Sequence, residues 1–327
     1  MLPPDVRLLF ELSGEHPTLP RAELSALLHS FGAPAEVPPG RAVVLNTAVD
    51  PKLLASRLAL THFVHEEIAS GTFQEIVAAA GGLQPEGTFS VRVKSYVTCH
   101  GREEMERKVA DQIRGKVDLD HPAVEYVVLI TADGHHLTRR IAATARAGFE
   151  ARRPSSRPFF HPTALHPRFA RALVNLTACP PGGTILDPFC GTGSLLVEAA
   201  LCGFQARGLD ASGEMIAGAS EILDAYGVAA ELRIGDVALL GEAGAVDAIV
   251  TDPPYGRSAS TYREPVPDLY RRFFAATAQL KSGTPVAVIL PAEEHVALAE
   301  EHLAREQVHR ARVHRSLDRH FCVFRVR

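Results

Sequence analysis

The carboxyl-terminal half of this chain is predicted to form an α/β domain, a doubly wound parallel sheet of seven strands that ends in an antiparallel edge hairpin. The amino-terminal half is predicted to form a smaller α+β domain. Three observations support this assignment. From Gly182 onward, short β-branched runs alternate with helical patterns, as in a parallel sheet covered by helices. The last two strand patterns have no helix between them, which predicts the hairpin. Several segments before residue 148 alternate polar and apolar residues, which is typical of strands.

Length and composition limit the number of domains and the class of protein. A chain of 327 residues is too long for one ordinary core and suggests two domains, or two with a small extra module. No stretch approaches a transmembrane helix and the amino terminus lacks a signal-peptide pattern, so we expect a cytoplasmic protein with no membrane partner. The five cysteines form no Cys-x-x-Cys pair and no zinc spacing, so no disulfide framework and no bound metal are expected. The net charge of −4 argues weakly against a nucleic-acid partner, although local basic clusters matter more.

Residues 1–60 are expected to form a ferredoxin-like module without catalytic residues. Its predicted elements are a strand at 7–12, a helix at 20–31, a strand at 42–45 and a helix at 51–60. Pro20 favours the start of the first helix and Gly32 favours its end.

Residues 61–147 continue the same alternation. The predicted elements are a strand at 61–69, a helix at 73–80, a strand at 89–94, a helix at 102–117 and a strand at 124–131. Arg92 and Lys94 are expected on one face of their strand because side chains alternate there. This order, with Val-Asp-Leu-Asp-His-Pro at 117–122 before the last strand, resembles the THUMP domain of RNA-modifying enzymes, which implies RNA binding. The alternative is a generic ferredoxin-like fold with a solvated charged helix.

A basic segment joins the two halves. Between residues 139 and 171, eight arginines stand against a single acid, Glu150, and the part around residues 153–158 is rich in proline and serine. We therefore place a basic linker at residues 148–162 and the catalytic domain at 163–327. Guanidinium groups bind phosphate bidentately, so this segment is a candidate RNA contact, and the alternative is a solubilising linker. The RNA-binding candidates are Arg92, Lys94, Arg139, Arg140, Arg152, Arg153 and Arg157.

The catalytic half follows a strand-helix order. Its expected strands are 184–187, 206–210, 231–234, 246–251, 285–290, 308–313 and 321–326, and its expected helices are 194–201, 213–226, 268–280 and 295–305. Ligands of such open sheets bind at the carboxyl ends of the strands, so the loops after the strands carry the candidate site.

The first of these loops reads Asp-Pro-Phe-Cys-Gly-Thr-Gly-Ser from Asp187 to Ser194. Gly191 and Gly193 allow the backbone to approach a ligand closely. A nicotinamide motif would need a third glycine where Leu196 stands.

The second and third strands of this half each end in an aspartate. Asp210, with Ala211, can accept hydrogen bonds from ribose hydroxyls, a role that nicotinamide and S-adenosylmethionine sites share. Asp236, with Val237, is placed to accept from an adenine amine. For both aspartates the alternative is a helix N-cap.

The fourth strand runs into Thr-Asp-Pro-Pro-Tyr-Gly at residues 251–256. An exocyclic base amine is a poor nucleophile because its lone pair is delocalised into the ring. Asp252 and the carbonyl of Pro253 can each accept one N–H and so direct the lone pair at an incoming methyl group. Tyr255 offers a ring on which an extruded base can stack. The alternative is an ordinary Pro-Pro turn.

These two loops carry a family resemblance. Asp-Pro-Pro-Tyr is similar to the signature of amino-group N-methyltransferases, and Asp-Pro-Phe-x-Gly-x-Gly resembles the loop of class I, Rossmann-like S-adenosylmethionine-dependent methyltransferases. The resemblance implies that the loop, including Cys190, surrounds the methionine part of the cofactor, with Asp187 towards its amino group. Phe-Phe-His-Pro-Thr at 159–163 resembles the motif that covers this end of the cofactor, which implies roles for Pro162 and Thr163, whereas His161 could be a packing residue.

The whole chain resembles archaeal-type tRNA (guanosine-10) N2-methyltransferases, strongly from Arg157 onward. The further motifs that carry this are Arg-Pro-Phe-Phe-His-Pro at 157–162, Arg-Ser at 257–258 and Val-His-Arg-Ser-Leu-Asp-Arg-His at 313–320. The resemblance implies methylation, once or twice, of the N2 amine of a guanosine on the D-stem side of tRNA. Some relatives work with a small zinc-binding activator protein, and the sequence does not decide whether this chain does. The rivals are another tRNA or ribosomal RNA site, DNA adenine N6-methylation, and RNA binding without catalysis.

Overall fold

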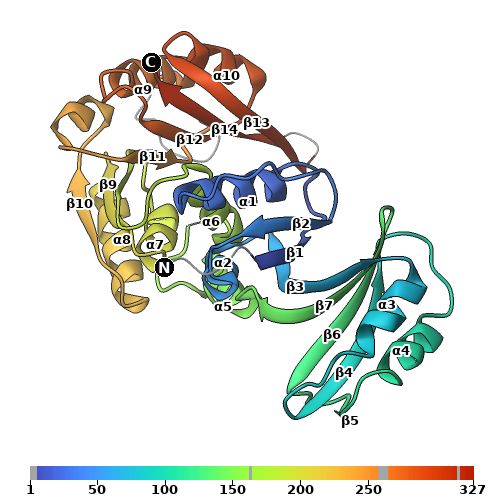
Figure 1. The fold of residues 1–327 in the computed structure, drawn as a ribbon. Helices are drawn as coiled ribbons and strands as arrows, with labels where there is room; N and C mark the ends of the chain where they lie inside the picture. The colour runs from blue at the N-terminus through green and yellow to red at the C-terminus, as the bar shows by residue number, and fades with distance from the viewer. Residues whose placement is uncertain (1–5, 162–163, 257–263, 315–316) are drawn as a thin grey trace. The chain divides into compact units, whose positions relative to one another are not determined.

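The structure of the chain, a computed structural model, describes residues 6–161, 164–256, 264–314 and 317–327 (Figure 1). Two compact units are present. The first consists of the described residues up to Arg21 with Ala35–Ser56 and Leu60–Thr144, and the second consists of Ala22–Pro34, Arg57–Ala59 and the described part of Ala145–Arg327. The first sixty residues therefore contribute to both units.

The first unit is built on a seven-stranded mixed sheet. Its strands are β1 (Val6–Leu12), β2 (Ala42–Thr47), β3 (Thr61–Gly71), β4 (Thr88–Ser95), β5 (Lys116–Val117), β6 (Val124–Thr131) and β7 (Gly134–Ala143), in the order β2-β1-β3-β7-β6-β4-β5. β4 is parallel to β5 and β6, and the remaining pairs are antiparallel. Because β1 pairs with β3, the division expected at residue 60 is not a break in this sheet.

One face of this sheet is covered by helices. α3 (Phe73–Ala80) starts with a capping box between Thr72 and Glu75, and α4 (Arg102–Ala110) lies beside it. Both bury apolar side chains against Phe89, Val91 and Val93 of β4. Arg92 and Lys94 alternate with these residues and so lie on the other face, as the strand pattern predicted.

α4 is shorter than the helix expected at residues 102–117. It ends at Ala110, and two tertiary contacts explain the early end. The backbone N–H of Arg114 donates to the Leu83 carbonyl at 3.2 Å. A Cβ added at Gly115 would lie 3.1 Å from the Phe89 ring, so the chain passes very close to β4 at that point. The following residues then pair with β4 as β5.

The first unit also holds a buried carboxylate. Glu11 of β1 is fully buried and accepts hydrogen bonds from His65 Nε2 at 2.8 Å, from the Tyr96 hydroxyl at 2.5 Å and from Lys94 Nζ. Burial opposes ionisation, but these three donors together lower the pKa of Glu11 to about 2. The cluster therefore holds β1, β3 and β4 together and occupies the ammonium group of Lys94.

The second unit is a doubly wound α/β domain. Its strands are β8 (Thr184–Asp187), β9 (Gln205–Asp210), β10 (Ala230–Ile234), β11 (Ala248–Thr251), β12 (Pro285–Leu290), β13 (Leu303–His314) and β14 (Leu317–Val326), in the order β10-β9-β8-β11-β12-β14-β13. β8 to β12 are parallel, and β14 runs antiparallel to both β12 and β13. The structure confirms the predicted parallel sheet with its antiparallel hairpin.

Helices cover both faces of this sheet (Figure 1). They are α5 (Arg146–Ala151), α6 (Pro167–Leu176), α7 (Ser194–Leu201), α8 (Gly213–Ala225), α9 (Val266–Thr277) and α10 (Glu293–Glu300), with short 3₁₀ helices η1 (Pro154–Ser156) and η2 (Val237–Glu242). α9, α10 and η2 pack on one face of the sheet and form a core with the strand side chains that point to that face, among them Cys322 of β14. Phe321, the next residue back along β14, points to the opposite face and contacts Phe169 of α6.

The helices α1 (Leu19–Ser30) and α2 (Pro51–Arg57) come from the first sixty residues. From Ala22 onward α1 belongs to the second unit. There the Glu23 side chain accepts from the Ala59 backbone and from Asn175 Nδ2, both at 2.8 Å. Glu23 and Asn175 are buried, so this polar contact ties the segment to α6.

The described part of the segment expected as a linker, residues 148–161, is packed into the second unit. It contains most of α5 and all of η1, and residues at both ends of η1 are held by side-chain contacts. Arg152 forms a bidentate ion pair with buried Glu198 of α7, at 2.9 and 3.1 Å. Arg157 is only 7 % exposed and donates to Ser194 Oγ and to the Arg152 carbonyl. Proline and serine here therefore shape a packed turn and not a free connector.

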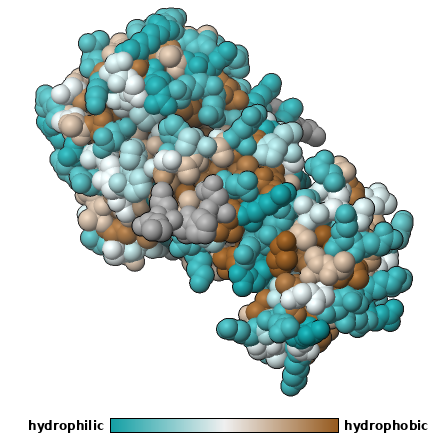
Figure 2. Space-filling view, viewed as in Figure 1, coloured by the Kyte–Doolittle hydropathy of each residue, from teal (hydrophilic) through white to brown (hydrophobic). Residues whose placement is uncertain are grey.

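Hydrophilic side chains cover most of the face that Figure 2 shows, with apolar residues gathered in smaller groups between them. In the described part of the chain, no helix has both the length and the apolar character needed to cross a membrane.

Candidate active site

A hydrogen bond joins the two predicted motif loops of the second unit. β8 and β11 are neighbours in the sheet and run parallel, so their carboxyl ends meet at one edge. The Thr251 hydroxyl donates to Asp187 Oδ1 at 2.7 Å, across 64 positions of sequence. The strand order reverses at this pair, since β9 and β10 lie beyond β8 while β12 lies beyond β11. This is the place where open α/β sheets bind their ligands.

Asp187 is the most buried acid at this edge, with 1 % of its surface exposed. Besides the Thr251 hydroxyl, its Oδ1 accepts the backbone N–H of Phe189 at 3.1 Å. Burial raises the pKa of Asp187 to about 7 in spite of these bonds, and the nearby charges of Asp210 and Asp252 add to the rise. A cationic group placed here would relieve that cost.

The glycine loop has the conformation that its residues predicted. Gly191 and Gly193 have φ values of +49° and +77°, in the region that favours glycine. Nothing lies within 4 Å of a Cβ built at Gly191, so open space borders the backbone there. Cys190 instead turns its buried side chain towards β9, where its sulfur would lie 3.0 Å from a Cβ on Gly208. Only the backbone of Cys190 is therefore placed to face a ligand.

Asp210 ends β9 and holds the glycine loop. Its two carboxylate oxygens accept the backbone N–H groups of Gly191 at 2.8 Å and Ser212 at 2.9 Å. Burial raises its pKa, and the charge of His161 acts in the opposite direction. Each oxygen keeps further lone pairs for donors such as ribose hydroxyls. Ala211, the next residue, is exposed.

Asp236 and Val237 follow β10. Asp236 Oδ1 caps η2 through the Ala238 N–H at 2.9 Å, so the N-cap role is present. Its Oδ2 pairs with Arg272 of α9 at 2.5 Å, which lowers the pKa of Asp236. Val237 is buried in the core with α9 and α10. An adenine amine at Asp236 would therefore have to share or displace the Arg272 guanidinium.

The catalytic loop after β11 is held by two tyrosines. The Tyr255 hydroxyl donates to Asp252 Oδ1, and the Tyr270 hydroxyl of α9 donates to the Pro254 carbonyl at 3.2 Å. Pro253 is buried beside them. Burial raises the pKa of Asp252 to about 6, while the charge of Arg319 and the Tyr255 bond oppose the rise. The carboxyl group of Asp252 is therefore partly shielded from solvent and held in one orientation.

Some predicted site residues lie outside the described part of the chain. They are Pro162 and Thr163 in the entry motif, the Arg-Ser pair at 257–258 and the Arg-Ser pair at 315–316. His161, at the edge of that gap, is partly buried.

The predicted RNA-binding residues divide into three groups. Arg157 is buried and used inside the second unit, so its placement contradicts an RNA contact. Five others pair with a carboxylate: Lys94 with Glu11, Arg139 with Glu66, Arg140 with Glu125, Arg152 with Glu198 and Arg153 with Glu150. Arg92 is exposed and donates to the Leu119 carbonyl at 2.9 Å. The count of arginines was visible in the sequence, but their acidic partners were not.

Sequence reasoning missed two residues that shape the site. Thr251 was read only as the end of a strand, and Tyr270 as part of a helix, yet both hydroxyls hold a motif loop. A polar residue at the last position of an otherwise apolar strand was an available signal for Thr251. No local signal points from Tyr270 to Pro254, because the contact depends on how α9 packs.

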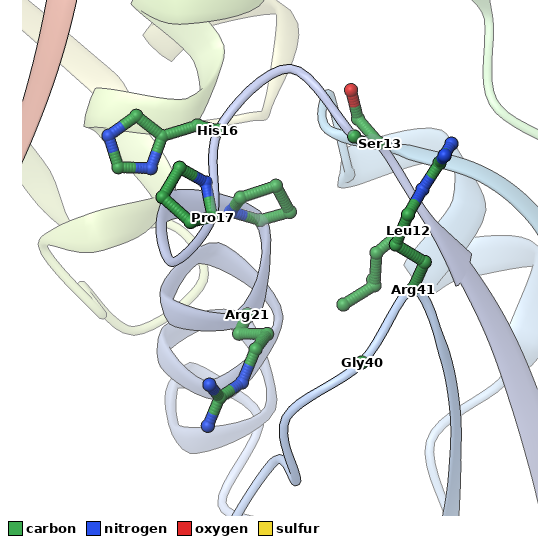
Figure 3. A pocket seen from close by; sticks show the side chains of 9 residues that line it. Leu12, Ser13, His16, Pro17, Arg21, Gly40 and Arg41 are labelled. Carbon is green, nitrogen blue, oxygen red and sulfur yellow. The ribbon is translucent and has the colours of Figure 1, made fainter. Parts of the chain in front are cut away.

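A cavity of about 220 Å³ lies in the first unit and is separate from the motif residues (Figure 3). It is lined by Leu12, Ser13, Gly14, His16, Pro17, Pro20, Arg21, Gly40 and Arg41. The Arg21 guanidinium is already bound to the Val37 carbonyl at 2.9 Å. Nothing in its lining corresponds to the cofactor or base chemistry of the second unit.

The strand order, the glycine loop after β8 and the Asp-Pro-Pro-Tyr loop after β11 define a class I S-adenosylmethionine-dependent methyltransferase. Residues 154–320 match the family model described as "RMKL-like, methyltransferase domain" (UPF0020). The chain belongs to the tRNA (guanine(10)-N2)-dimethyltransferase family: it is 36 % identical to that enzyme of Methanothermobacter thermautotrophicus, over 94 % of this chain and 96 % of the relative.

A second relative agrees with this assignment, and a solved structure agrees with the fold. The tRNA (guanine(10)-N2)-dimethyltransferase of Pyrococcus abyssi is 32 % identical, over 97 % of this chain and 99 % of its own. The crystal structure of TrmN from Thermus thermophilus matches with a TM-score of 0.57 and 22 % identity, over 98 % of this chain and 99 % of that one. At that identity the structural match supports the fold alone.

Proposed function

We propose that this chain transfers a methyl group from S-adenosylmethionine to the exocyclic N2 of guanosine 10 in tRNA, on the D-stem side, once or twice. The observation that carries the proposal is the bond from Thr251 to Asp187, which brings a cofactor-type loop and a base-amine loop to one edge of the sheet. Membership of the family supports guanine in tRNA over the adenine of DNA as the target.

The residues at this edge suit the proposed cofactor. S-adenosylmethionine, when bound, supplies an electrophilic methyl group on a sulfonium centre. Asp187 would bind its cationic amino group, and the open backbone at Gly191 and Gly193 would border its methionine part. Asp210 would accept from the ribose hydroxyls and Asp236 from the adenine amine. The remaining predicted contacts, Pro162, Thr163, Cys190, Ala211 and Val237, stay predictions.

The Asp252 loop would bind and orient the target amine. Its Oδ1 is held by Tyr255, which leaves Oδ2 to accept one N–H of the amine, while the Pro253 carbonyl accepts the other. The amine lone pair is then directed away from the ring plane and the carboxylate can take the proton that methylation releases. A guanosine in a stem must be turned out first, and stacking on the Tyr255 ring would offset part of that cost.

The tRNA partner would be recognised mainly by the first unit, which we assign as THUMP-like. Arg92, an exposed residue on the face of β4 opposite α3 and α4, is the strongest phosphate contact among the candidates because no acidic side chain pairs with it among the described residues. Arg139, Arg140 and Arg153 remain candidates that would exchange a carboxylate for phosphate. The zinc-binding activator protein and the cytoplasmic location stay predictions.

Arg92→Ala is expected to weaken tRNA binding evenly across tRNA sequences. The association constant should also fall less steeply with salt, with the magnitude of the slope of log K against log salt smaller by roughly 0.7–0.9. The reason is the loss of one phosphate contact. Fluorescence anisotropy between 50 and 300 mM KCl would measure it. Arg107→Ala is the matched control, because Arg107 is an exposed arginine of the same unit on α4, over the other face. Equal slopes for both variants would contradict the assignment.

The pH dependence of cofactor binding tests Asp187. The pKa of this group is about 7 in the free protein, and a cationic amino group favours its ionised form. Below pH 7 the free carboxyl holds a proton that binding must release, so Kd is expected to rise up to about tenfold per pH unit. Titration calorimetry with S-adenosylhomocysteine, in buffers of different ionisation enthalpy, would measure both Kd and the released proton. Asp187→Asn should remove the dependence, and a flat wild-type profile would argue against this role.

The proposed function itself is tested by incubating the chain with labelled S-adenosylmethionine and an unmodified tRNA transcript. Nuclease digestion and mass spectrometry then locate the label and count the methyl groups. Label on the N2 amine of guanosine 10 is the expected result. Label elsewhere, or on DNA adenine only, would contradict the proposal, and a parallel reaction with an added activator protein tests whether a subunit is needed.

A further inference from the structure

A partly buried arginine, Arg319, lies at the edge of the sheet that carries the catalytic loop. β14 runs antiparallel to β12, with His320 opposite Leu290 at the end of β12. The first residues of β14 therefore lie at the same edge as the loop after β11, which is the other neighbour of β12. Arg319 is one position beyond the Leu290 to His320 pair on this edge.

The direction of the Arg319 side chain follows from strand alternation. Cys322 packs into the core with α9 and α10, and His320 approaches Glu293 of α10 at 3.8 Å. Phe321, between them, contacts Phe169 of α6 on the opposite face. Arg319 shares that face with Phe321. One strand, β12, lies between β14 and β11, so two inter-strand spacings place β14 roughly 10 Å from β11, a span that an arginine side chain and a bound base can bridge together.

The Arg319 guanidinium is partly buried and incompletely paired. Its Nε is shielded from solvent and has no hydrogen-bond acceptor among the described residues. Buried N–H groups of this kind normally have a partner, because an unsatisfied donor costs free energy. Burial raises the pKa of both Asp252 and Tyr255, and the charge of Arg319 opposes that rise in each. The arginine is therefore close to the atoms that would receive the base.

The chemistry of guanine suits such a donor. When the N2 amine faces an acceptor, O6 lies at the other end of the same edge of the base, and N7 lies next to O6. Arginine donates to O6 and N7 together, the commonest specific contact with guanine. Adenine carries an amine at the position that O6 occupies in guanine. The guanidinium would therefore face a second donor there and find no acceptor. A carboxylate beside an arginine thus selects a base with an amine at one end and a carbonyl at the other.

We propose that Arg319 is a specificity-determining residue that donates to O6 and N7 of the target guanine while Asp252 receives its N2 amine. The inference rests on the proposed function and adds the group that distinguishes guanine from other amine-bearing bases. Asp252 and the tyrosines select for an amine, and Arg319 selects for the carbonyl.

The test compares two enzymes, wild type and Arg319→Ala, on two tRNAs, so that the effects of the mutation and of the base change can be separated. One tRNA carries guanosine at the target position and the other carries 2-aminopurine, which keeps the N2 amine but has hydrogen in place of O6. Wild type is expected to lose about 5- to 150-fold in kcat/KM on 2-aminopurine, the range of one bidentate base contact. Arg319→Ala is expected to lose a similar factor on guanosine and to treat both tRNAs within about twofold of each other. The altered protonation of N1 in 2-aminopurine affects both enzymes and cancels in this comparison.

Further variants separate recognition from folding. Arg319→Lys keeps the charge and one donor direction, so it should recover part of the activity on guanosine and little on a 7-deazaguanosine tRNA. Arg325→Ala, at the far end of β14, is the matched control and should leave the ratio between the two tRNAs unchanged. Thermal melting and tRNA affinity of Arg319→Ala should stay close to wild type.

Equal losses by Arg319→Ala on both tRNAs would overturn the proposal and indicate a phosphate contact or a structural role. Methylation of the guanosine tRNA by wild type is measured first in the same assay and tests the proposed function separately. Absence of that product would contradict the proposed function, and with it the inference that rests on it.

Discussion

Asp252→Ala is expected to lower the rate of tRNA methylation by roughly 10²- to 10⁴-fold, the range for a positioned group that accepts a proton in the transition state. The carboxyl group lies in a partly buried loop, held by Tyr255 and by the Tyr270 bond to Pro254. Its removal leaves the target amine without a directed acceptor. Single-turnover kinetics with saturating cofactor would measure the loss without a contribution from product release.

Two comparisons make the Asp252 result specific. Asp252→Asn keeps an acceptor oxygen of the same size but no charge, so a smaller loss than for alanine would assign part of the effect to hydrogen bonding and the rest to proton acceptance. Tyr255→Phe removes the donor to Asp252 Oδ1 and keeps the ring. Affinities for S-adenosylhomocysteine and tRNA should change little in Asp252→Ala. A collapse of both affinities would show that Asp252 is a structural residue.

Glu198→Gln is expected to destabilise the second unit by about 3–5 kcal/mol. The Glu198 side chain is 1 % exposed and binds two arginines, Arg152 at 2.9 and 3.1 Å and Arg171 at 2.8 Å. Removing its charge leaves two guanidinium groups without a counter-charge in a poorly solvated place. For a unit of this size the melting temperature should fall by roughly 6–20 °C.

Circular dichroism melting of the full chain would measure the Glu198 effect. Glu104→Gln is the matched control, since Glu104 forms a solvent-exposed pair with Lys108 and its loss should leave the melting temperature nearly unchanged. A triple variant with Glu198→Leu, Arg152→Met and Arg171→Leu should regain much of the lost stability, because it removes the unpaired charges as well. Equal melting temperatures for Glu198→Gln and Glu104→Gln would contradict the prediction.

The cluster of Glu198, Arg152 and Arg171 also shows what local sequence patterns cannot predict. A run of arginines with prolines and serines predicted a linker, and that pattern is a sound signal for exposed chain. The acid that pairs with Arg152 lies 46 positions away on α7. Local composition does not indicate a partner that is so distant in sequence. The packed turn and the burial of Arg157 are therefore visible only in the folded chain.

Local signals were sufficient for most elements. The helix at Phe73–Ala80 and the strands at Thr184–Asp187, Val124–Thr131 and Pro285–Leu290 have the predicted bounds, because the alternation and burial of each are set within the element. The helix expected to reach residue 117 ends at Ala110, since the chain there is drawn against β4. The boundary expected at residue 60 depends on tertiary pairing as well, because β1 pairs with β3 and α1 contributes to the second unit.

The sequence by itself determined the two loops that carry the chemistry, their residue types, and the strands that present them, because glycine torsions, proline turns and apolar periodicity are local properties. Only the tertiary structure decided which side chains meet. Thr251 reaches Asp187 because β8 and β11 are neighbours in the sheet, and Arg319 comes to the edge of Asp252 because β14 runs back beside β12. Sheet order is set by the packing of the whole unit, and no single segment contains it.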